Sequence, residues 1–133
     1  ENIIITEDGT PKIMDFGLAL APGASRLTSP GGVCGTLPYM APEQLRGDPV
    51  LTPAVDVYAV GCMLYEMLAG TPAFGGDSIT SAKMTGAPPP LRNHRPDAPA
   101  ALLAVVETCL AREASDRYPD GAALAAALRG AAS

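Results

Sequence analysis

The sequence lacks any apolar run of the roughly 20 residues that a helix needs to cross a bilayer, and it shows no signal peptide. It also lacks a cluster of positive charge, because nine Lys and Arg residues are scattered among 14 Asp and Glu residues and the net charge is −5. Nucleic acids and anionic membranes bind to clustered positive charge. We therefore expect no nucleic-acid partner, and no membrane contact within this chain.

Cysteine and histidine are scarce too. Cys34, Cys62 and Cys109 are far apart, odd in number and not spaced as metal ligands, and two of them lie in apolar helical patterns. Cysteine in such a pattern acts as a small hydrophobic residue, which favours a reducing compartment, the cytoplasm. The single histidine, His94, has no Cys or His nearby. We interpret it as a surface residue of a connector.

What the sequence does contain is enough for one domain with a hydrophobic core. Of the 133 residues, 47% are hydrophobic and 17% are charged, which is ordinary globular composition. The first residue is Glu1 and not methionine. We therefore expect the chain to be a piece of a longer protein, with any membrane anchor of that protein outside these residues.

The residue pattern predicts a hairpin, then a long loop, then helices. Strands are expected at 3–6 and 12–14, joined by a turn with an Asp-Gly pair. Residues 18–37 are rich in Gly, Pro and Ser without a sustained period, which is typical of a functional loop. Helices are expected at 42–45, 54–69 and 77–84, after Pro99, and around 124–128. The helix over 54–69 is apolar nearly all round, so it belongs in the middle of an assembly.

Three sequence segments indicate the chemistry. Asp15-Phe16-Gly17 ends an apolar run, and "GTLPYMAPEQ" follows at residues 35–44, with "DVYAVGCMLYEMLAGTPAF" behind it. In this order and spacing they resemble the C-terminal lobe of the protein kinases, in the serine/threonine branch. The resemblance covers essentially the whole chain. It implies a mainly α fold from an α+β parent, in which a short β-hairpin and an activation loop precede a helical bundle around a central buried helix.

The resemblance also implies domain boundaries. Residues 1–133 would form part of one protein kinase domain, the C-lobe only. Within it, residues 1–17 would form the metal-binding hairpin and the Asp-Phe-Gly motif, 18–43 the activation segment and 44–133 the helical subdomain.

The implied activity is transfer of the γ-phosphate of ATP to Ser or Thr of a protein substrate. This reaction needs Mg²⁺ or Mn²⁺ held by hard oxygen ligands. By resemblance Asn2, which closes the catalytic loop, and Asp15 are the metal ligands, and Phe16 and Gly17 complete the cofactor site. The alternative for Asp15 is a turn residue that accepts hydrogen bonds from backbone amides. The alternative for Phe16 and Gly17 is ordinary packing at the end of a strand.

Four further residues acquire roles from the resemblance. Thr36 would contact the catalytic aspartate, and its alternative is a hydroxyl that caps a local turn. Glu43 and Arg117 would form a buried bidentate salt bridge, and the alternative is two unrelated surface charges. Asp56 would accept hydrogen bonds from the catalytic-loop backbone. Its alternative is an acidic residue that complements the helix dipole.

The long loop offers candidate phosphorylation sites at Thr28 and Ser29, with Ser25 as a weaker candidate. A phosphate there would order the loop against a basic pocket. The alternative is that these hydroxyl groups are simply solvated.

The chain lacks the family's glycine-rich loop, its strand lysine and its catalytic aspartate, so we expect these residues alone to be inactive. The alternative for the parent protein is a pseudokinase or a protein-interaction module with a kinase fold. The family also packs another long helix along the central one. We therefore expect an isolated chain of marginal stability, with an exposed apolar strip at Val60, Leu64 and Leu68.

Overall fold

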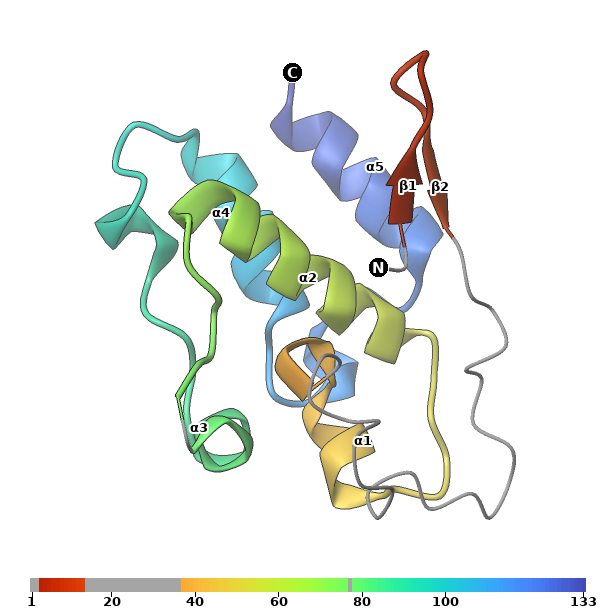
Figure 1. The fold of residues 1–133 in the computed structure, drawn as a ribbon, viewed down its shortest axis with the longest axis vertical. Coiled ribbons are helices and arrows are strands. Elements are labelled where there is room, and N and C mark those ends of the chain that lie inside the picture. Colours follow the sequence, from red (N-terminus) through yellow and green to blue (C-terminus); the bar gives the residue numbers. More distant parts are fainter. Residues whose placement is uncertain (1–2, 14–36, 77) are drawn as a thin grey trace. The chain divides into compact units, whose positions relative to one another are not determined.

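The computed structural model describes residues 3–13, 37–76 and 78–133 (Figure 1). These residues form mainly helices and one two-stranded antiparallel sheet, which confirms the expected fold class. The chain divides into two compact units, residues 1–33 and 34–133. No helix in the described ranges is both long and apolar enough to cross a membrane.

The first unit contains the predicted hairpin. Strand β1 covers Ile3–Ile5 and strand β2 covers Pro11–Ile13, with Ile3 opposite Ile13. Thr6, expected in the first strand, lies in the turn instead, because its backbone N–H donates to the Thr10 carbonyl at 2.9 Å. The turn needs the predicted Asp-Gly pair. Gly9 adopts φ = 83°, and the Asp8 carboxylate accepts hydrogen bonds from the Thr6 hydroxyl and the Thr10 backbone N–H.

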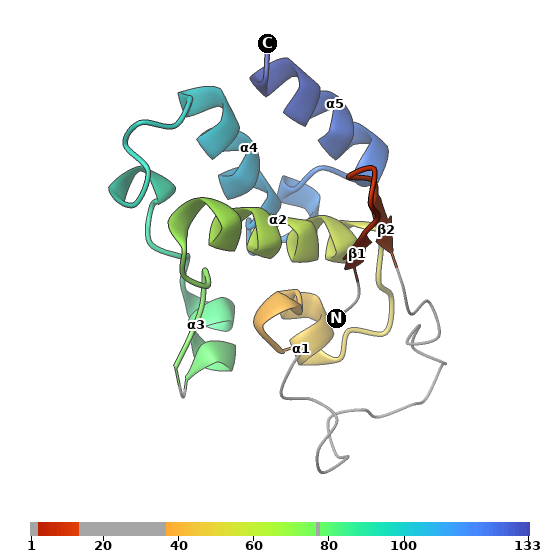
Figure 2. The ribbon, with the colours of Figure 1, turned by 45° about the horizontal axis from the view of Figure 1, so that its top comes forward.

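The second unit is built around α2, which covers Ala54–Ala69 as predicted. It ends at Gly70, where φ is 74° and the backbone N–H donates to the Glu66 carbonyl. Figure 2 shows α2 crossing the middle of this unit, with α4 and α5 on one side and α1 and α3 on the other. The helix therefore occupies the central place that its apolar character indicated.

The other helices agree with the sequence pattern to within a few residues. Helix α1 covers Pro42–Arg46 and ends at Gly47, helix α3 covers Ile79–Thr85, helix α4 covers Ala100–Cys109 and helix α5 covers Gly121–Ala131. Asp120 caps α5, since its carboxylate accepts from the Ala123 backbone N–H at 2.8 Å. Short 3₁₀ helices cover Leu37–Tyr39, Leu91–Asn93 and Ala114–Asp116.

Two hydrophobic clusters hold the second unit together. The larger cluster joins α2 to α4 and to the connector before α4, and its buried members include Tyr58, Cys62, Tyr65, Leu91, Leu103 and Val106. The smaller cluster joins α2 to α4 and α5, and its buried members are Val57, Val105, Cys109 and Leu124. Gly61 lets α2 and α4 approach closely, because a Cβ atom there would lie 2.6 Å from the Cβ atom of Cys109. Cys62 and Cys109 are free and buried, and burial raises the pKa of each thiol to about 11.

The prediction of an exposed apolar strip on α2 is wrong. Leu64 and Leu68 are half-buried and pack against the larger cluster, and Val60 packs against the smaller one. The exposed apolar residue of α2 is Met67, which is 77% accessible. Since α2 has almost no polar face, its sequence did not indicate which side its neighbours leave uncovered.

Candidate functional site

Most residues expected to carry the chemistry lie outside the described residues. These are the expected metal and cofactor residues Asn2, Asp15, Phe16 and Gly17, the expected catalytic contact Thr36, and the candidate phosphorylation sites Ser25, Thr28 and Ser29. Two described residues lie near the expected metal ligands in the sequence: Ile3 follows Asn2, and Ile13 is two residues before Asp15. These two isoleucines are partners across the hairpin. Within the described ranges, no group of three or more His, Cys, Asp or Glu side chains could hold a metal ion.

The structure brings Glu43 and Arg117 together. Glu43 belongs to α1, and Arg117 follows the 3₁₀ helix Ala114–Asp116, 74 positions along the chain. The guanidinium donates from Nη1 to Oε1 of Glu43 at 2.7 Å and from Nη2 to Oε2 at 2.8 Å. Each residue is 5% accessible. This is a buried bidentate ion pair, so the alternative of two unrelated surface charges does not hold.

Arg117 also donates to three backbone carbonyl groups. Nε donates to Ala111 at 2.7 Å, Nη1 to Ala54 at 3.1 Å and Nη2 to Arg112 at 2.9 Å. With the two bonds to Glu43, these contacts use all five N–H donors of a guanidinium. The group also lies over the ring of Tyr58, 4.8 Å from the ring centroid. Arg117 therefore ties together α1, the start of α2 and the segment after α4.

Burial raises the pKa of the Glu43 carboxyl and is the largest single effect. The hydrogen bonds from Arg117, a backbone hydrogen bond and the nearby positive charges of Arg117 and Arg46 together outweigh it, so the pKa lies below its usual value. The carboxylate is thus charged in the folded protein at neutral pH. Asp56 is different, since its side chain is exposed in the first turn of α2. This position suits both the helix-dipole interpretation and a hydrogen bond to a segment outside the described residues.

Sequence reasoning missed Lys83. This residue lies in α3 and is only 1% accessible. Its Nζ donates to the backbone carbonyls of Leu37 at 3.0 Å, Pro38 at 2.6 Å and Met40 at 2.8 Å. Lys83 is four residues after Ile79 and so lies on the same helix face, but this spacing alone does not indicate that a lysine is buried.

Two aromatic rings surround the ammonium group of Lys83. Its Nζ lies 5.2 Å from the centroid of Tyr58 and 5.6 Å from that of Phe74. Burial lowers the pKa of Lys83 to about 8. The amine therefore keeps its proton at neutral pH, and three N–H groups face three carbonyl oxygens.

The segment that Lys83 contacts forms the edge of an open hollow. Tyr39 lines this hollow with Met63, Glu66 and Met67, and its volume is about 340 Å³. The Tyr39 hydroxyl donates to Oε2 of Glu66 at 2.9 Å, and this hydrogen bond raises the pKa of Tyr39. The hollow has an apolar floor on α2 and one acidic group at its side.

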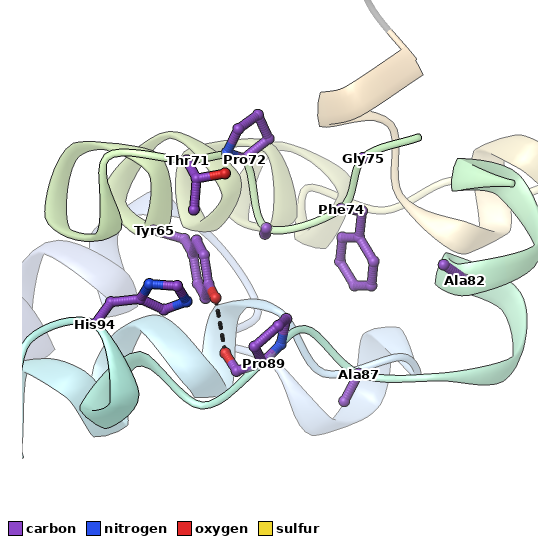
Figure 3. Close-up of a pocket in the computed structure, with 10 residues that line it drawn as sticks. Tyr65, Thr71, Pro72, Phe74, Gly75, Ala82, Ala87, Pro89 and His94 are labelled. Atoms are coloured by element: carbon purple, nitrogen blue, oxygen red, sulfur yellow. Dashed lines mark hydrogen bonds between the residues drawn. The ribbon is translucent and has the colours of Figure 1, made fainter. Parts of the chain in front are cut away.

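A second hollow, of about 370 Å³, lies between the C-terminal end of α2, α3 and the connector before α4 (Figure 3). The Tyr65 hydroxyl donates to the Pro89 carbonyl at 2.8 Å, and the ring of His94 meets that of Tyr65 edge-on at 6.1 Å. Figure 3 also shows the ring of Phe74 pointing into this space. His94 is exposed, as expected, and its ring packs against an aromatic neighbour. The lining is mainly apolar, so this hollow offers packing surface.

Comparison with known proteins gives a consistent result. The family described as "Protein kinase domain" matches residues 1–126. The serine/threonine-protein kinase PknH of Mycobacterium bovis is 39% identical over 130 residues, which cover 96% of this chain and 22% of that protein. PknL of Mycobacterium tuberculosis is 38% identical over 142 residues, covering 96% and 33%. PknE of the same species is 38% identical over 133 residues, covering 98% and 23%. The chain therefore spans a third or less of the length of these relatives.

Proposed function

This chain belongs to the protein kinase family, and we propose that it forms most of the C-lobe of a serine/threonine kinase that transfers the γ-phosphate of ATP to a protein substrate. The observation that carries the proposal is the family match over residues 1–126, which includes both Asp15-Phe16-Gly17 and Ala41-Pro42-Glu43. The relatives named above are all serine/threonine-protein kinases, which supports Ser and Thr as the acceptor residues.

We propose the same division of the chain that the motifs indicated. Residues 1–17 form the metal-binding hairpin and the Asp-Phe-Gly motif, 18–43 form the activation segment, and 44–133 form the helical subdomain. The division is supported by the hairpin, which lies within residues 1–17, and by helices α2 to α5, which all lie within residues 44–133. Phosphate on Thr28, Ser29 or Ser25 would act within the activation segment by adding negative charge to it.

We propose Asn2 and Asp15 as the ligands of a divalent cation, Mg²⁺ or Mn²⁺. An amide oxygen and a carboxylate are hard donors that suit these ions. The hairpin register supports the pairing, because Ile3 is next to Asn2 in sequence, Ile13 is two residues before Asp15, and the two isoleucines are partners. When bound, the cation neutralises charge on the phosphate oxygens of ATP. Phe16 and Gly17 complete this site in the proposal.

The ion pair of Glu43 and Arg117 supports a structural role in the proposed mechanism. Glu43 ends the activation segment, and Arg117 joins it to Ala54, the first residue of α2. The segment is therefore anchored at its C-terminal end. Thr36, seven residues earlier, is proposed to contact the catalytic aspartate, and Asp56 is proposed to accept hydrogen bonds from the catalytic-loop backbone.

The 133 residues alone are proposed to be inactive. They contain no glycine-rich loop and no family catalytic aspartate, and phosphoryl transfer depends almost entirely on positioning and charge stabilisation by such groups. The proposed location is the cytoplasm, which the free thiols of Cys62 and Cys109 support.

The test is phosphate transfer by the protein that contains this chain, with Mg²⁺, labelled ATP and a generic protein substrate. We expect transfer by the wild type. D15N should lower kcat by about 100-fold or more, since charge stabilisation by a metal is worth several kcal/mol. E7Q is the control, because Glu7 is an exposed acidic residue in the turn of the hairpin, and its replacement should leave kcat unchanged. A wild-type protein that binds ATP without transferring phosphate would favour the pseudokinase, and transfer by residues 1–133 alone would refute the inactivity of the fragment.

A further inference from the structure

We propose that Lys83 is a positioning residue for the protein substrate, because it fixes the backbone of residues 37–40 against α3. This inference rests on the proposed kinase function. The three carbonyl oxygens that accept from Nζ belong to Leu37, Pro38 and Met40, at 2.6 to 3.0 Å. An ammonium group has three N–H donors, so each of them has one backbone partner. Three bonds from one atom fix the place of this segment relative to α3.

Among the described residues, the segment has few other backbone hydrogen bonds. Within it, the Met40 N–H donates to the Leu37 carbonyl at a long 3.3 Å, and Pro38 has no N–H to donate. Residues 37–39 form a single turn of 3₁₀ helix, which is too short to be stable by itself. Without Lys83, the carbonyls of Pro38 and Met40 would lose the partner that the structure gives them. The conformation of this segment therefore depends on a side chain 43 to 46 positions later in the sequence.

Burying this lysine is costly for stability. Among the described residues no carboxylate pairs with Lys83. Its charge is almost fully buried, and its surroundings there include neutral carbonyls and the rings of Tyr58 and Phe74. An apolar side chain of similar volume would avoid the cost of burying a charge. A methionine would fill the same space and keep the contacts of the aliphatic stem. We infer that the role of the ammonium group is to hold the carbonyl groups of Leu37, Pro38 and Met40 in position.

Residues 37–40 lie close to the proposed reaction centre. Leu37 follows Thr36 directly, and a fully extended chain covers about 3.6 Å per residue, so the whole segment lies within about 14 Å of Thr36. In this proposal, a substrate that presents its hydroxyl group near Thr36 places its neighbouring residues along this segment. Tyr39 lies between the held carbonyls, and its side chain lines the open hollow with Glu66 and Met67. Lys83 therefore fixes the conformation of residues 37–40, the surface that the substrate contacts in this proposal.

The experiment compares K83M with R129M in the longer kinase that contains this chain. R129M is the matched control, because it removes one cation from an exposed position of α5 and lies outside the proposed site. We expect K83M to raise KM for a peptide substrate about tenfold, which corresponds to about 1.4 kcal/mol. KM for ATP should change little, and R129M should match the wild type. K83R, which keeps the charge and several N–H donors, should recover most of the lost affinity for the peptide.

Hydrogen exchange gives a readout that does not depend on activity. The amides of Tyr39 and Met40 should exchange faster in K83M, while those of α4 stay unchanged. If K83M does not fold, K83Q replaces it, since an amide offers at most two N–H donors and leaves one carbonyl without a partner. Unchanged exchange at Tyr39 and Met40 overturns the proposal, and so does a loss of kcat or stability with an unchanged peptide KM. A wild-type protein without phosphate transfer refutes the proposed function instead, and the exchange result still decides whether Lys83 holds the segment.

Discussion

Replacement of Arg117 by methionine tests the ion pair that anchors the proposed activation segment. Methionine keeps an unbranched side chain of similar length but removes the five donated hydrogen bonds of the guanidinium. Glu43 would then remain buried and charged without its partner, at 5% accessibility. The perturbation is therefore an uncompensated charge, and the volume changes little.

The expected loss is large. Removing one partner of a buried pair costs about 3–5 kcal/mol, against a total stability of about 5–15 kcal/mol for a typical domain. The carbonyls of Ala54, Ala111 and Arg112 also lose a donor, which adds to the loss. If the charge on Glu43 is the main cause, the double variant E43M/R117M should be more stable than R117M alone, since two apolar side chains leave no unpaired charge.

The assay is urea unfolding of the kinase domain, followed by far-UV circular dichroism. R95M is the matched control, because Arg95 forms an ion pair with Asp97 in which the two side chains are 40% and 65% accessible. Exposed pairs contribute about 0–1 kcal/mol, so R95M should shift the midpoint little. A loss for R117M within about 1 kcal/mol of that for R95M would show that the buried pair does not have the strength that the reasoning assigns to it.

Two further predictions concern the same unit. G61A should destabilise the domain by about 1–3 kcal/mol, because the new Cβ atom would overlap Cys109. In the control G130A, the new Cβ atom meets no atom within 4 Å, so this variant should stabilise α5 slightly. Urea midpoints of the two variants that shift in the same direction would contradict this prediction. The lowered pKa of Glu43 contributes stability that is present above its usual value near 4.5 and is lost as the pH falls through the folded-state pKa. The free energy of unfolding of the wild type should therefore fall more steeply below pH 4.5 than that of E43Q, and equal slopes would refute the link.

The helices could be predicted because their signals are local. Gly47 and Gly70 mark the ends of α1 and α2, and both adopt the left-handed conformation that such ends require. The apolar stripe after Pro99 likewise predicted α4. Strand β2 begins one residue earlier than expected, at Pro11. Boundaries of such short strands depend on pairing across the turn, which the residue pattern indicates only approximately.

The contacts of Lys83 could not be predicted in the same way. A lysine in a seven-residue helix is by itself an exposed residue of good helix propensity. Its burial arises because residues 37–40 bring three carbonyls to α3, and no local pattern encodes that meeting. The side of α2 that stays open has the same origin, since Met67 is exposed and Leu64 is covered only because of where the neighbouring segments pack.

The sequence by itself determined the family, the order of the elements and the partners Glu43 and Arg117, because motifs and helix signals are carried by residues near one another or by a resemblance that spans the chain. Only the tertiary structure decided how Arg117 uses its five donors and that Lys83 holds residues 37–40. The physical reason is that burial and hydrogen bonding of a charged side chain depend on which distant backbone groups surround it, and folding alone brings those groups together.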